Sequence, residues 1–466
     1  CGGRAPGGDL IVPAKYSVYI PCRNCGDFVA EAIESVLRQT ERDWELIVVD
    51  DGSTDHTAEA LDPYRGVPGI TIHRTEGIGL PRVCNLALAE AKGEYLIRLD
   101  GDDVFDENIL LVLGRQLDLD PSLALVFPDY YLMDRAGNVF AHERRRRLYR
   151  DDHLLDQPPN GACILARRQV LLDLGGYRED LGAQDGLDLW TRIRDRYKTA
   201  NVNLPLFYYR RHDTNLTTNH SLIINARRQI KRDAAEQRLA AIRPVVAVIP
   251  CRRHYDFVPE VWKLELAGQT LLEHSVRACL ASDMIDHVVV ASDDPEAEAA
   301  VRSFGESRLH FVLRDPHDTI RSASLVPTLE KAVRPFDPEM RGIVLVRYLQ
   351  TPLVTTGTME EAITTLAGND ADAAVGVTEF KDHMLYGRDG FGLRQIANAT
   401  GFGEGTFYAD ARTCTAVRSR NIARGAMTGP AMVGFVIAAF ESFFIGSHEH
   451  LDLARLIWKT REEGGQ

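Results

Sequence analysis

Short apolar runs alternate with amphipathic stretches in the amino-terminal part of the chain. Three runs have the length and the β-favouring composition of buried strands: Ser17 to Ile20, Leu46 to Val49 and Tyr95 to Leu99. Phe28 to Arg38 has its apolar residues on one helical face, and a second helix begins at Pro81 and ends before Gly93. This alternation predicts a parallel sheet with right-handed crossovers and its loops at one edge.

The predicted strands end in carboxylates. The second strand runs into Asp50 and Asp51, and the third runs into Asp100 and Asp102. Because ligands of open α/β sheets bind outside the carboxyl ends of the strands, we expect these four residues to face one crevice. An Asp-x-Asp pair there offers hard oxygen ligands to a divalent cation that also holds substrate phosphates. An acidic turn that caps the next helix is the alternative interpretation.

A second alternation of strands and helices begins at Val245. Ser221 to Ile242 is polar, Arg-rich and compatible with a helix, and Pro244 follows it, so we interpret this stretch as a connector. The predicted organisation is a flexible tail (1–14), a first domain (15–220), a helical connector (221–243) and a second domain (244–460). The predicted fold class is α/β, with two Rossmann-like open parallel-sheet domains.

Composition narrows the class of protein. The chain has 466 residues and 45% hydrophobic content, enough for two or three domains with full cores. A net charge of -13 argues against a nucleic-acid partner. The longest apolar candidate for a membrane span, Ala431 to Phe440, is stopped by Glu441 and is interpreted as a core strand. We therefore expect no transmembrane segment.

Eight cysteines are spread along the chain without the spacing of a disulfide framework. Cys22 and Cys25 form one C-x-x-C pair, which we interpret as reduced loop thiols, with zinc or redox use as the alternative. Reduced cysteines suit a cytoplasmic protein, and peripheral attachment to the inner face of the membrane is a further expectation.

The strand-end motifs resemble those of a known family. Ile20-Pro21, Val48 to Asp55 and Gly93 to Asp103 have the order and spacing of the nucleotide-binding half of family 2 glycosyltransferases with the GT-A fold. Downstream, Gly175 to Tyr177 and Gln184 to Trp190 are similar to the acceptor-side motif of that family, and Tyr208 to His212 follow. The resemblance extends from about residue 15 to about residue 215.

The resemblance implies a metal-dependent inverting glycosyltransferase that moves a sugar from a nucleotide-diphosphate donor to a hydroxyl acceptor. Asp102 would bind Mn²⁺ or Mg²⁺, which neutralises charge on the departing diphosphate. Arg210, Arg211 and His212 would assist at the diphosphate or the metal, with surface charges in a turn as the alternative. The residues expected to bind the donor nucleotide are Pro21, Arg23, Asn24, Asp50, Asp51, Arg82, Asp100 and Gly101.

Asp185 is the expected general base. A sugar hydroxyl is a poor nucleophile, so a carboxylate within hydrogen-bond reach must take its proton as it attacks the anomeric carbon. Gln184 stands where the family often has Glu, which removes a neighbouring negative charge and leaves the base in place. We interpret Trp190 as a core residue rather than a sugar platform, and a carboxylate on the helix surface is one interpretation of Asp188.

Four consecutive arginines follow Glu143. A solvated basic loop is the favoured interpretation of Arg144 to Arg147. The alternative is that this loop clamps an anionic acceptor, such as a lipid-linked diphosphate or a phosphorylated glycan.

The second domain resembles cytidylyltransferases that make CMP-activated acidic sugars. The resemblance rests on six segments: Ile249 to Arg252, Leu264 to Leu272, Val288 to Asp294, Thr351 to Leu353, Asp372 to Val377 and Leu451 to Ala454. The Gly-rich, Lys-bearing phosphate loop of that family is replaced by Arg253 to Phe257, and its late pair of metal-binding aspartates falls at Phe444 and Gly446. We therefore expect no cytidylyltransferase activity and a role in docking, homo-oligomer formation or ligand sensing. Arg252, Arg253, His254 and Lys263 retain capacity to bind anions.

Two other functions stay open. One is a bifunctional enzyme that both makes a CMP-sugar and transfers a sugar, and the other is a scaffold that only binds nucleotides. The expected partners are a nucleotide-sugar donor and a glycan, lipid-linked or protein acceptor, in the synthesis of surface glycans or glycoconjugates. The donor base, the sugar and the acceptor do not follow from these residues.

Overall fold

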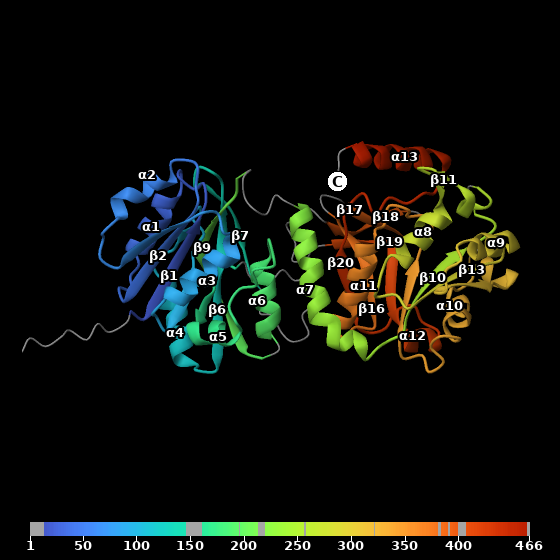
Figure 1. Ribbon diagram of the computed structural model, residues 1–466, viewed down its shortest axis with the longest axis horizontal. Helices are drawn as coiled ribbons and strands as arrows, with labels where there is room; N and C mark the ends of the chain where they lie inside the picture. The colour runs from blue at the N-terminus through green and yellow to red at the C-terminus, as the bar shows by residue number, and fades with distance from the viewer. Residues whose placement is uncertain are drawn as a thin grey trace, which may run out of the picture. The chain divides into compact units, whose positions relative to one another are not determined.

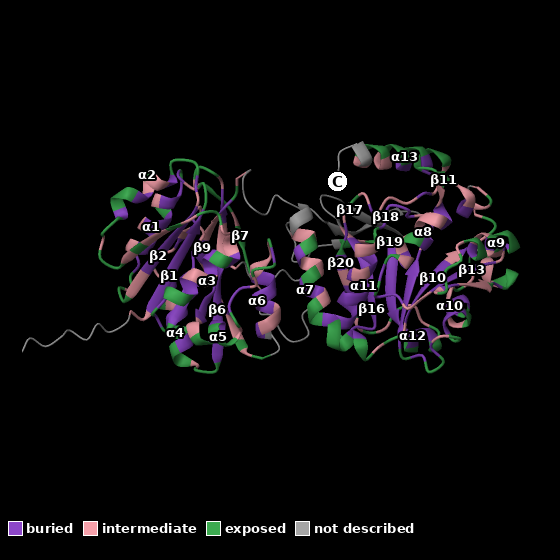
Figure 2. Ribbon diagram, viewed as in Figure 1, coloured by how far each residue is buried: buried purple, intermediate pink, exposed green. Residues whose placement is uncertain are grey.

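The computed structural model describes residues 14–145, 161–194, 196–212, 220–255, 258–320, 322–380, 384–389, 392–398 and 407–463. The chain divides into two compact units, the first ending at Ile230 and the second beginning at Lys231. Each unit has a central β-sheet with helices packed against it (Figure 1). Strands in the middle of each sheet are buried, and the exposed residues lie mainly on helices and loops (Figure 2). The predicted α/β class is confirmed.

The first unit contains a sheet of nine strands over the described residues, in the order β3-β2-β1-β4-β8-β6-β9-β5, with β7 paired to β6. Its strands are β1 (Tyr16–Cys22), β2 (Trp44–Asp51), β3 (Ile70–Thr75), β4 (Tyr95–Arg98), β5 (Val104–Phe105), β6 (Leu123–Met133), β7 (Val139–Glu143), β8 (Leu165–Arg167) and β9 (Lys198–Arg210). The neighbours β3, β2, β1 and β4 are parallel, as predicted. The remainder is mixed, because β8 is antiparallel to β4 and to β6.

Helices cover both faces of this sheet. They are α1 (Val29–Leu37), α2 (Thr57–Leu61), the 3₁₀ turn η1 (Asp62–Tyr64), α3 (Leu80–Glu90), α4 (Ile109–Leu119), α5 (Arg168–Asp173) and α6 (Asp185–Arg194). Val18 and Ile20 of β1 pack with α1 and α4, while Tyr19 packs on the opposite face with α3 and α6. This alternation of neighbouring side chains follows from the period of two in a strand. Because both faces of the sheet are covered by apolar packing, polar residues converge at the ends of the strands.

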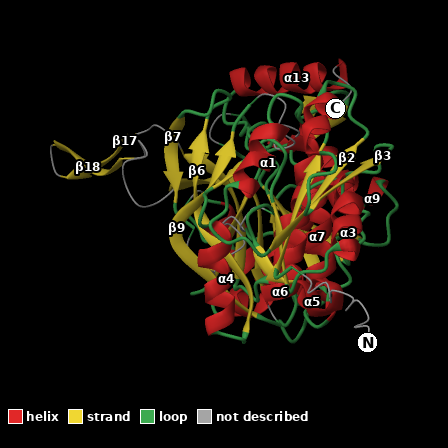
Figure 3. Cartoon of the chain, turned by 90° about the vertical axis from the view of Figure 1, so that its left-hand side faces the viewer, coloured by secondary structure: helices red, strands yellow, loops and turns green. Residues whose placement is uncertain are grey.

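The second unit contains a sheet of seven strands over the described residues, in the order β14-β13-β10-β15-β19-β16-β20. Its strands are β10 (Val245–Cys251), β13 (His287–Ser292), β14 (Leu309–Leu313), β15 (Ile343–Arg347), β16 (Ala373–Phe380), β19 (Phe407–Arg418) and β20 (Met432–Val436). The strands β14, β13, β10 and β15 are parallel, and β19 is antiparallel to both of its neighbours. Two small ribbons pair β11 (Glu265–Leu266) with β12 (Gln269–Thr270) and β17 (Met384–Asp389) with β18 (Gly392–Asn398), the latter visible in Figure 3.

The helices of this part of the chain are α7 (His220–Ala240), α8 (Leu271–Leu280), α9 (Pro295–Ser303), α10 (Val326–Val333), α11 (Thr356–Gly368), α12 (Ser419–Ala423) and α13 (His448–Glu463), with 3₁₀ turns η3 (Val261–Lys263) and η4 (Pro316–Thr319). The predicted connector is the helix α7, and its Lys231 Nζ lies 2.5 Å from Glu361 Oε1 of α11 in a buried ion pair. Within the described ranges, no helix combines the length and the apolar content that a membrane span requires.

The predicted core strand over 431–440 is shorter in the structure. β20 covers only Met432–Val436, and both of these end residues are exposed, while Val433 and Phe435 between them are buried. The reason is its place at the edge of the sheet, where one face packs on the core and the other meets solvent.

Candidate functional site

The carboxyl ends of β1, β2 and β4 lie side by side. β1 pairs in parallel with β2, which places Cys22 opposite Asp50, and with β4, which places Tyr19 opposite Arg98. The loops that follow these strands therefore start at one edge of the sheet. Pro21, the Asp50 loop and the Asp100 loop come together there, as the sequence predicts.

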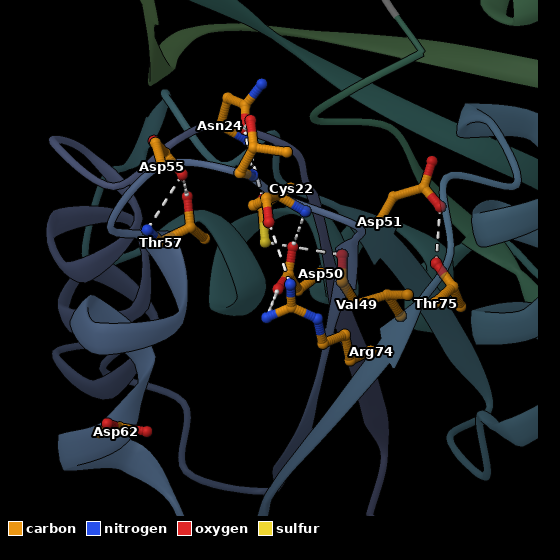
Figure 4. Close-up of polar contacts among 12 residues, drawn as sticks. Cys22, Asn24, Val49, Asp50, Asp51, Asp55, Thr57, Asp62, Arg74 and Thr75 are labelled. Atoms are coloured by element: carbon orange, nitrogen blue, oxygen red, sulfur yellow. Dashed lines mark hydrogen bonds and ion pairs between the residues drawn. The ribbon is translucent and has the colours of Figure 1, made fainter.

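Asp50 and Asp51 have separate partners (Figure 4). Asp50 is buried, its Oδ1 accepts a hydrogen bond from the Ser53 amide at 2.9 Å, and its Oδ2 lies 3.3 Å from Arg74 Nη1. Asp51 points the other way, and its Oδ1 accepts a hydrogen bond from the Thr75 hydroxyl at 2.6 Å. The amide of Gly79, at the start of α3, donates to Asp51 Oδ2 at 2.8 Å.

Burial raises the pKa of the Asp51 carboxyl, but hydrogen bonds from Thr75 and from the amides of Gly79 and Ile78 outweigh burial and leave the pKa below its usual value. Asp51 is therefore a fixed anion at the base of the loop that leads into α3. A carboxylate in this state can accept further hydrogen bonds from a ligand, since each oxygen has two acceptor sites.

Asn24 ties the loop after β1 to the loop after β2. The backbone N–H of Asn24 donates a hydrogen bond to Ser53 Oγ at 2.9 Å, and its side-chain Oδ1 accepts one from the backbone N–H of Thr54 at 2.9 Å (Figure 4). Its φ of 55° lies in the left-handed region, which Asn adopts more readily than most residues. The neighbouring Arg23 is exposed, and its charge helps to lower the pKa of Asp51. Arg82 is also exposed, and its Nε lies 3.2 Å from Glu179 Oε2.

Asp102 and His212 form the candidate metal site. Asp102 Oδ2 lies 2.9 Å from His212 Nε2, and the His212 ring stacks on Phe28 with 5.2 Å between ring centroids. This distance is that of a direct hydrogen bond, and side chains this close could also both bind one cation such as Mn²⁺ or Mg²⁺. Within the described residues, no cluster of three metal-ligating side chains occurs. A cation here would therefore take its other ligands from water and from substrate oxygens.

Arg210 stays a predicted helper at the diphosphate, and its described contacts are with protein groups. Its Nε donates to the Asp102 carbonyl oxygen at 2.8 Å, its Nη1 to the Arg135 carbonyl oxygen at 3.0 Å, and its Nη2 to Glu31 Oε2 at 2.6 Å. The residue is 2% exposed. In these contacts the guanidinium group is turned inward and supports the loop that carries Asp102. Arg211 is exposed at the same turn.

Arg98 is the residue that motif comparison missed. At the end of β4, its Nε donates to Asp100 Oδ1 at 2.6 Å and its Nη2 donates to Asp100 Oδ2 at 3.1 Å. Its Nη1 donates to Asp185 Oδ2, so one guanidinium group joins the donor-side loop to the expected base. The signal was a charged residue inside the otherwise apolar strand Tyr95–Arg98.

Charge and burial act together on this group. The Arg98 side chain is 7% exposed and that of Asp185 is 11% exposed. Burial lowers the pKa of Arg98, but the two carboxylates outweigh it, so the pKa is raised. Burial also raises the pKa of Asp100. The group is thus a desolvated cluster in which one cation serves two carboxylates.

Asp185 is the first residue of α6, and Gln184 before it has a φ of 63°. A carboxylate in the first turn of a helix is stabilised by the helix dipole. Asp188 is buried, and its Oδ2 lies 2.5 Å from Arg192 Nη2, which corrects its interpretation as a surface carboxylate. Trp190 is buried and packs edge-on against Phe127, so it is a core residue, as we expected.

The C-x-x-C pair supports the Asp100 loop by packing. Cys22 and Cys25 are both free, and burial raises the pKa of Cys25 to about 12. A Cβ atom placed on Gly101 would lie 2.8 Å from Cys22 Cβ and 3.3 Å from Cys25 Sγ. The loop passes so close to the cysteines that only glycine fits there.

Part of the arginine run can be placed. The Arg145 amide donates to Asp129 Oδ1 at 2.8 Å, and its guanidinium lies 4.6 Å from the centre of the Tyr130 ring. Arg146 and Arg147 lie outside the described residues. Both interpretations of the run therefore stay open.

The corresponding strand ends of the second unit carry other residues. The Arg253 amide donates to Asp293 Oδ1 at 2.8 Å, and Arg252 stacks on Tyr255. Lys263 Nζ lies 2.6 Å from Glu296 Oε2. Asp294 caps α9 through the Glu296 amide at 3.0 Å. Of the loop that replaces the phosphate-binding loop, Asp256 and Phe257 lie outside the described residues.

Comparison with known proteins matches each unit to a family. Residues 17–175 match the model of Glycosyl transferase family 2, and residues 263–389 match the model of Cytidylyltransferase. The first unit is therefore similar to family 2 glycosyltransferases over residues 17–175, and the second is similar to cytidylyltransferases over residues 263–389.

Curated relatives match the first of these regions. Glycosyltransferase GlyG of Streptococcus pneumoniae is 32% identical over 126 residues, which is 27% of this chain and 42% of the relative. Chondroitin synthase of Escherichia coli is 31% identical over 139 residues, which is 30% of this chain and 20% of the relative. The chain thus spans less than half the length of these two relatives. S. aureus TarS in complex with UDP-GlcNAc shares 19% identity, with a TM-score of 0.40 over 47% of this chain and 66% of TarS.

Proposed function

We propose that the first unit is a metal-dependent inverting glycosyltransferase that moves a sugar from a nucleotide-diphosphate donor to a hydroxyl group of an acceptor. The observation that supports this most is the linkage at the strand ends. Asp102 lies beside His212, and two residues before it Asp100 is joined through Arg98 to Asp185. Groups suited to a diphosphate and a group suited to a hydroxyl proton thus belong to one cluster.

The donor nucleotide would bind along the ends of β1 and β2. Asp51 is a fixed acceptor for ribose or base donors, and Arg23 is an exposed cation beside it. Asp50 and Asn24 shape the two loops through their hydrogen bonds to Ser53. Asp102 and His212 would hold Mn²⁺ or Mg²⁺, and the cation would neutralise charge on the leaving diphosphate. Arg211 is placed to add a second positive charge there.

Asp185 would act as the base. Its Oδ2 is held by Arg98, so Oδ1 is the oxygen left to accept the proton of the acceptor hydroxyl. A base on α6 approaches from the acceptor side, while the diphosphate leaves from the side of the Asp102 loop. Attack opposite the leaving group inverts the configuration of the anomeric carbon, in line with the general logic of single displacement at a sugar.

The test is a transfer assay on the full chain. UDP-, GDP-, CDP- and dTDP-sugars are supplied with Mn²⁺ and an oligosaccharide acceptor, and release of the nucleoside diphosphate is measured with and without EDTA. We expect one donor class to react, EDTA to stop the reaction, and the product anomer to be opposite to the donor anomer by NMR. Retention of configuration, or full activity in EDTA, would contradict the proposal.

The acceptor is proposed by analogy with the relatives. A match to chondroitin synthase supports a role in assembling a polysaccharide or another glycoconjugate, with a glycan, lipid-linked or protein acceptor. The predicted location, in the cytoplasm or at the inner face of the membrane, stays a prediction.

We also propose that the second unit lacks cytidylyltransferase activity and serves in docking, dimerisation or ligand sensing. Phe444 and Gly446 offer no carboxylate for a cation, and Lys263 is engaged by Glu296. The family match of residues 263–389 favours the competing possibility, a bifunctional enzyme. Formation of a CMP-sugar from CTP and an acidic sugar by the full chain would establish the bifunctional enzyme and overturn this proposal.

A further inference from the structure

We propose that Arg98 is a positioning residue that holds Asp185 for proton transfer and couples its orientation to the donor-side carboxylate Asp100. This inference rests on the proposed function, because it takes Asp185 as the base. It adds a physical link between the two halves of the site, which come from segments far apart in the sequence.

Geometry supports the coupling. Arg98 uses all three guanidinium nitrogens, with Nε and Nη2 on the two oxygens of Asp100 and Nη1 on Asp185. A guanidinium group is planar and rigid, so a bidentate contact with one carboxylate fixes the direction of the remaining N–H groups. The Arg98 carbonyl oxygen also accepts from the Cys163 amide at 2.9 Å. A movement of Asp100 when a donor binds would therefore turn the group that holds Asp185.

The charge balance is suited to a base. One guanidinium cation faces two carboxylates, so the three groups together keep one negative charge when all are ionised. Arg98 contacts Asp185 without being its partner alone, because Asp100 shares the same cation. Within the described residues, Asp185 Oδ1 has no hydrogen-bond partner, so it is available to a substrate hydroxyl.

The cluster is closed on its other sides by groups that stay neutral. Cys84 Sγ lies 4.0 Å from Arg98 Nη1, and burial raises the pKa of Cys84 to about 12. Tyr19 donates its hydroxyl hydrogen to the Tyr177 hydroxyl at 2.9 Å, and burial raises the pKa of both. On the donor side, burial and the charge of Asp102 raise the pKa of Asp100, and burial with the charges of Asp102 and Asp100 raises the pKa of Asp103.

Gly161 gives a second way to disturb the pair without removing a charge. A Cβ atom on Gly161 would lie 2.6 Å from Asp185 Oδ2 and 2.9 Å from Arg98 Nη1. Real Cβ atoms do not approach so closely, so an alanine here has to push the two side chains apart. Gly161→Ala therefore tests the contact, while Arg98→Met tests the charge.

The experiment measures kcat, KM and the pH profile of kcat for the full chain and five variants. In Arg98→Met we expect kcat to fall about 100-fold with less than about a threefold change in the donor KM. The acidic limb of the profile should move to higher pH, because the loss of a neighbouring cation makes any carboxylate easier to protonate. Arg98→Lys should bring the limb back without restoring kcat, since an ammonium group lacks the fork that spans two carboxylates.

Arg192→Met is the matched control. Arg192 also pairs with an aspartate of α6, Asp188, at 2.5 Å, but this pair lies outside the proposed site. We expect Arg192→Met to lower the melting temperature. The acidic limb of its kcat profile should stay at the wild-type pH, and its kcat should be near that of the wild type. If Arg98→Met does not fold, Gly161→Ala tests the contact between Arg98 and Asp185 instead, and we expect the same loss in kcat.

A folded Arg98→Met or Gly161→Ala variant with a wild-type kcat and acidic limb would overturn the inference, as would the same limb shift in Arg192→Met. The fifth variant, Asp185→Asn, separates this failure from failure of the proposed function. If Asp185→Asn still transfers sugar, the proposed base is wrong. If it is inactive while Arg98→Met is normal, only the coupling by Arg98 is wrong.

Discussion

In the first unit β1 lies between β2 and β4, all three parallel, and in the second unit β10 lies between β13 and β15 in the same way. An arginine ends the corresponding strand in each case, Arg98 in β4 and Arg347 in β15, and both are buried. Their partners differ. Arg98 is held by the carboxylates of Asp100 and Asp185, whereas Arg347 donates to the Tyr348 carbonyl oxygen and to the hydroxyl and carbonyl oxygens of Thr351.

The electrostatic outcome is opposite at the two positions. The carboxylates raise the pKa of Arg98 against the effect of burial, while burial lowers the pKa of Arg347. At Arg347 the guanidinium serves to shape the loop Tyr348 to Thr351 through neutral acceptors. Two similar sheets thus differ at this edge: the first unit has a buried arginine between two carboxylates, and the described residues of the second unit have no such cluster. The fold sets where a site can form, and the strand-end residues decide whether it does.

The largest expected effect contrasts an aspartate from each edge. We expect Asp102→Ala to lower the rate of sugar transfer at least about 1000-fold, because a metal ion supplies several kcal/mol of charge stabilisation. Asp293→Ala, the matched change at the second edge, should leave the rate within about twofold. Release of the nucleoside diphosphate under saturating donor measures both, and equal losses in the two variants would break the comparison.

The next effect separates binding from proton transfer. Asp185→Asn keeps the size of the side chain and removes its basicity, so we expect kcat to fall about 10²- to 10⁴-fold. Calorimetry should show that the variant binds the nucleoside diphosphate and Mn²⁺ as the wild type does. Loss of diphosphate binding would place Asp185 in the donor site instead.

Arg347→Met sharpens the contrast between the two buried arginines. The change leaves the Thr351 and Tyr348 carbonyl oxygens without their donor, so we expect the second unit to lose about 3 kcal/mol of its free energy of unfolding. Sugar transfer should be retained under conditions where the protein is folded. Native-state hydrogen exchange of the amides in β10 and β15, with a transfer assay in parallel, measures the two outcomes. A stable variant with impaired transfer would mean that this edge takes part in the reaction.

Gly101→Ala probes the close contact beneath the Asp100 loop. The new Cβ would lie 2.8 Å from Cys22 Cβ, so the loop must shift, at a cost of about 2 kcal/mol in the free energy of unfolding. We expect diphosphate binding to weaken with it, since Asp102 follows directly. The matched control is Gly368→Ala in α11, where a new Cβ would meet nothing within 4 Å, so we expect an unchanged or higher free energy of unfolding. Gly425→Ala is not a suitable control, because the φ of Gly425 is positive. A Gly101→Ala variant with unchanged stability would contradict the packing argument.

The smallest effect is a pH dependence of the second unit. Burial and the neighbouring His287 lower the pKa of His310. The centroid of its ring lies 4.4 Å from that of the Phe336 ring. The unfolded chain then binds more protons than the folded one as the pH falls below about 6.5, so the unit should be less stable at pH 5.5 than at pH 7.5. Hydrogen exchange in β13 and β14 should show this, and His310→Gln should reduce the difference. An unchanged difference in the variant would assign the effect to other groups.

Much of the fold was predictable from local pattern. The strands β1, β2 and β4 and the helices α1 and α3 follow from apolar runs and helix signals, and they give the parallel part of the first sheet. The antiparallel strands β5 and β8 were not predicted. They cover two and three residues, and such short segments carry no period that distinguishes a strand from a loop.

The candidate site was predictable as far as motifs reach. The sequence places Asp50, Asp100 and Asp102 at strand ends, but the partners that set their state come from distant segments. Arg98 meets Asp185 across 87 positions, and Arg210 meets Glu31 across 179. The spacing of residues within a motif does not indicate such contacts, so it points neither to Arg98 nor to the contact between Arg210 and Glu31. The roles assigned to the individual residues stay predictions.

The central claim is that the working edge of this chain lies in the first unit and uses Asp102. Calorimetric titration of UDP, GDP, CDP, dTDP and CTP in the presence of Mn²⁺, on the wild type and on Asp102→Ala, tests it most directly. The account predicts that one nucleoside diphosphate binds the wild type and that the variant loses this binding. Binding of CTP alone, with equal affinity for wild type and variant, would place the working site in the second unit and contradict the account.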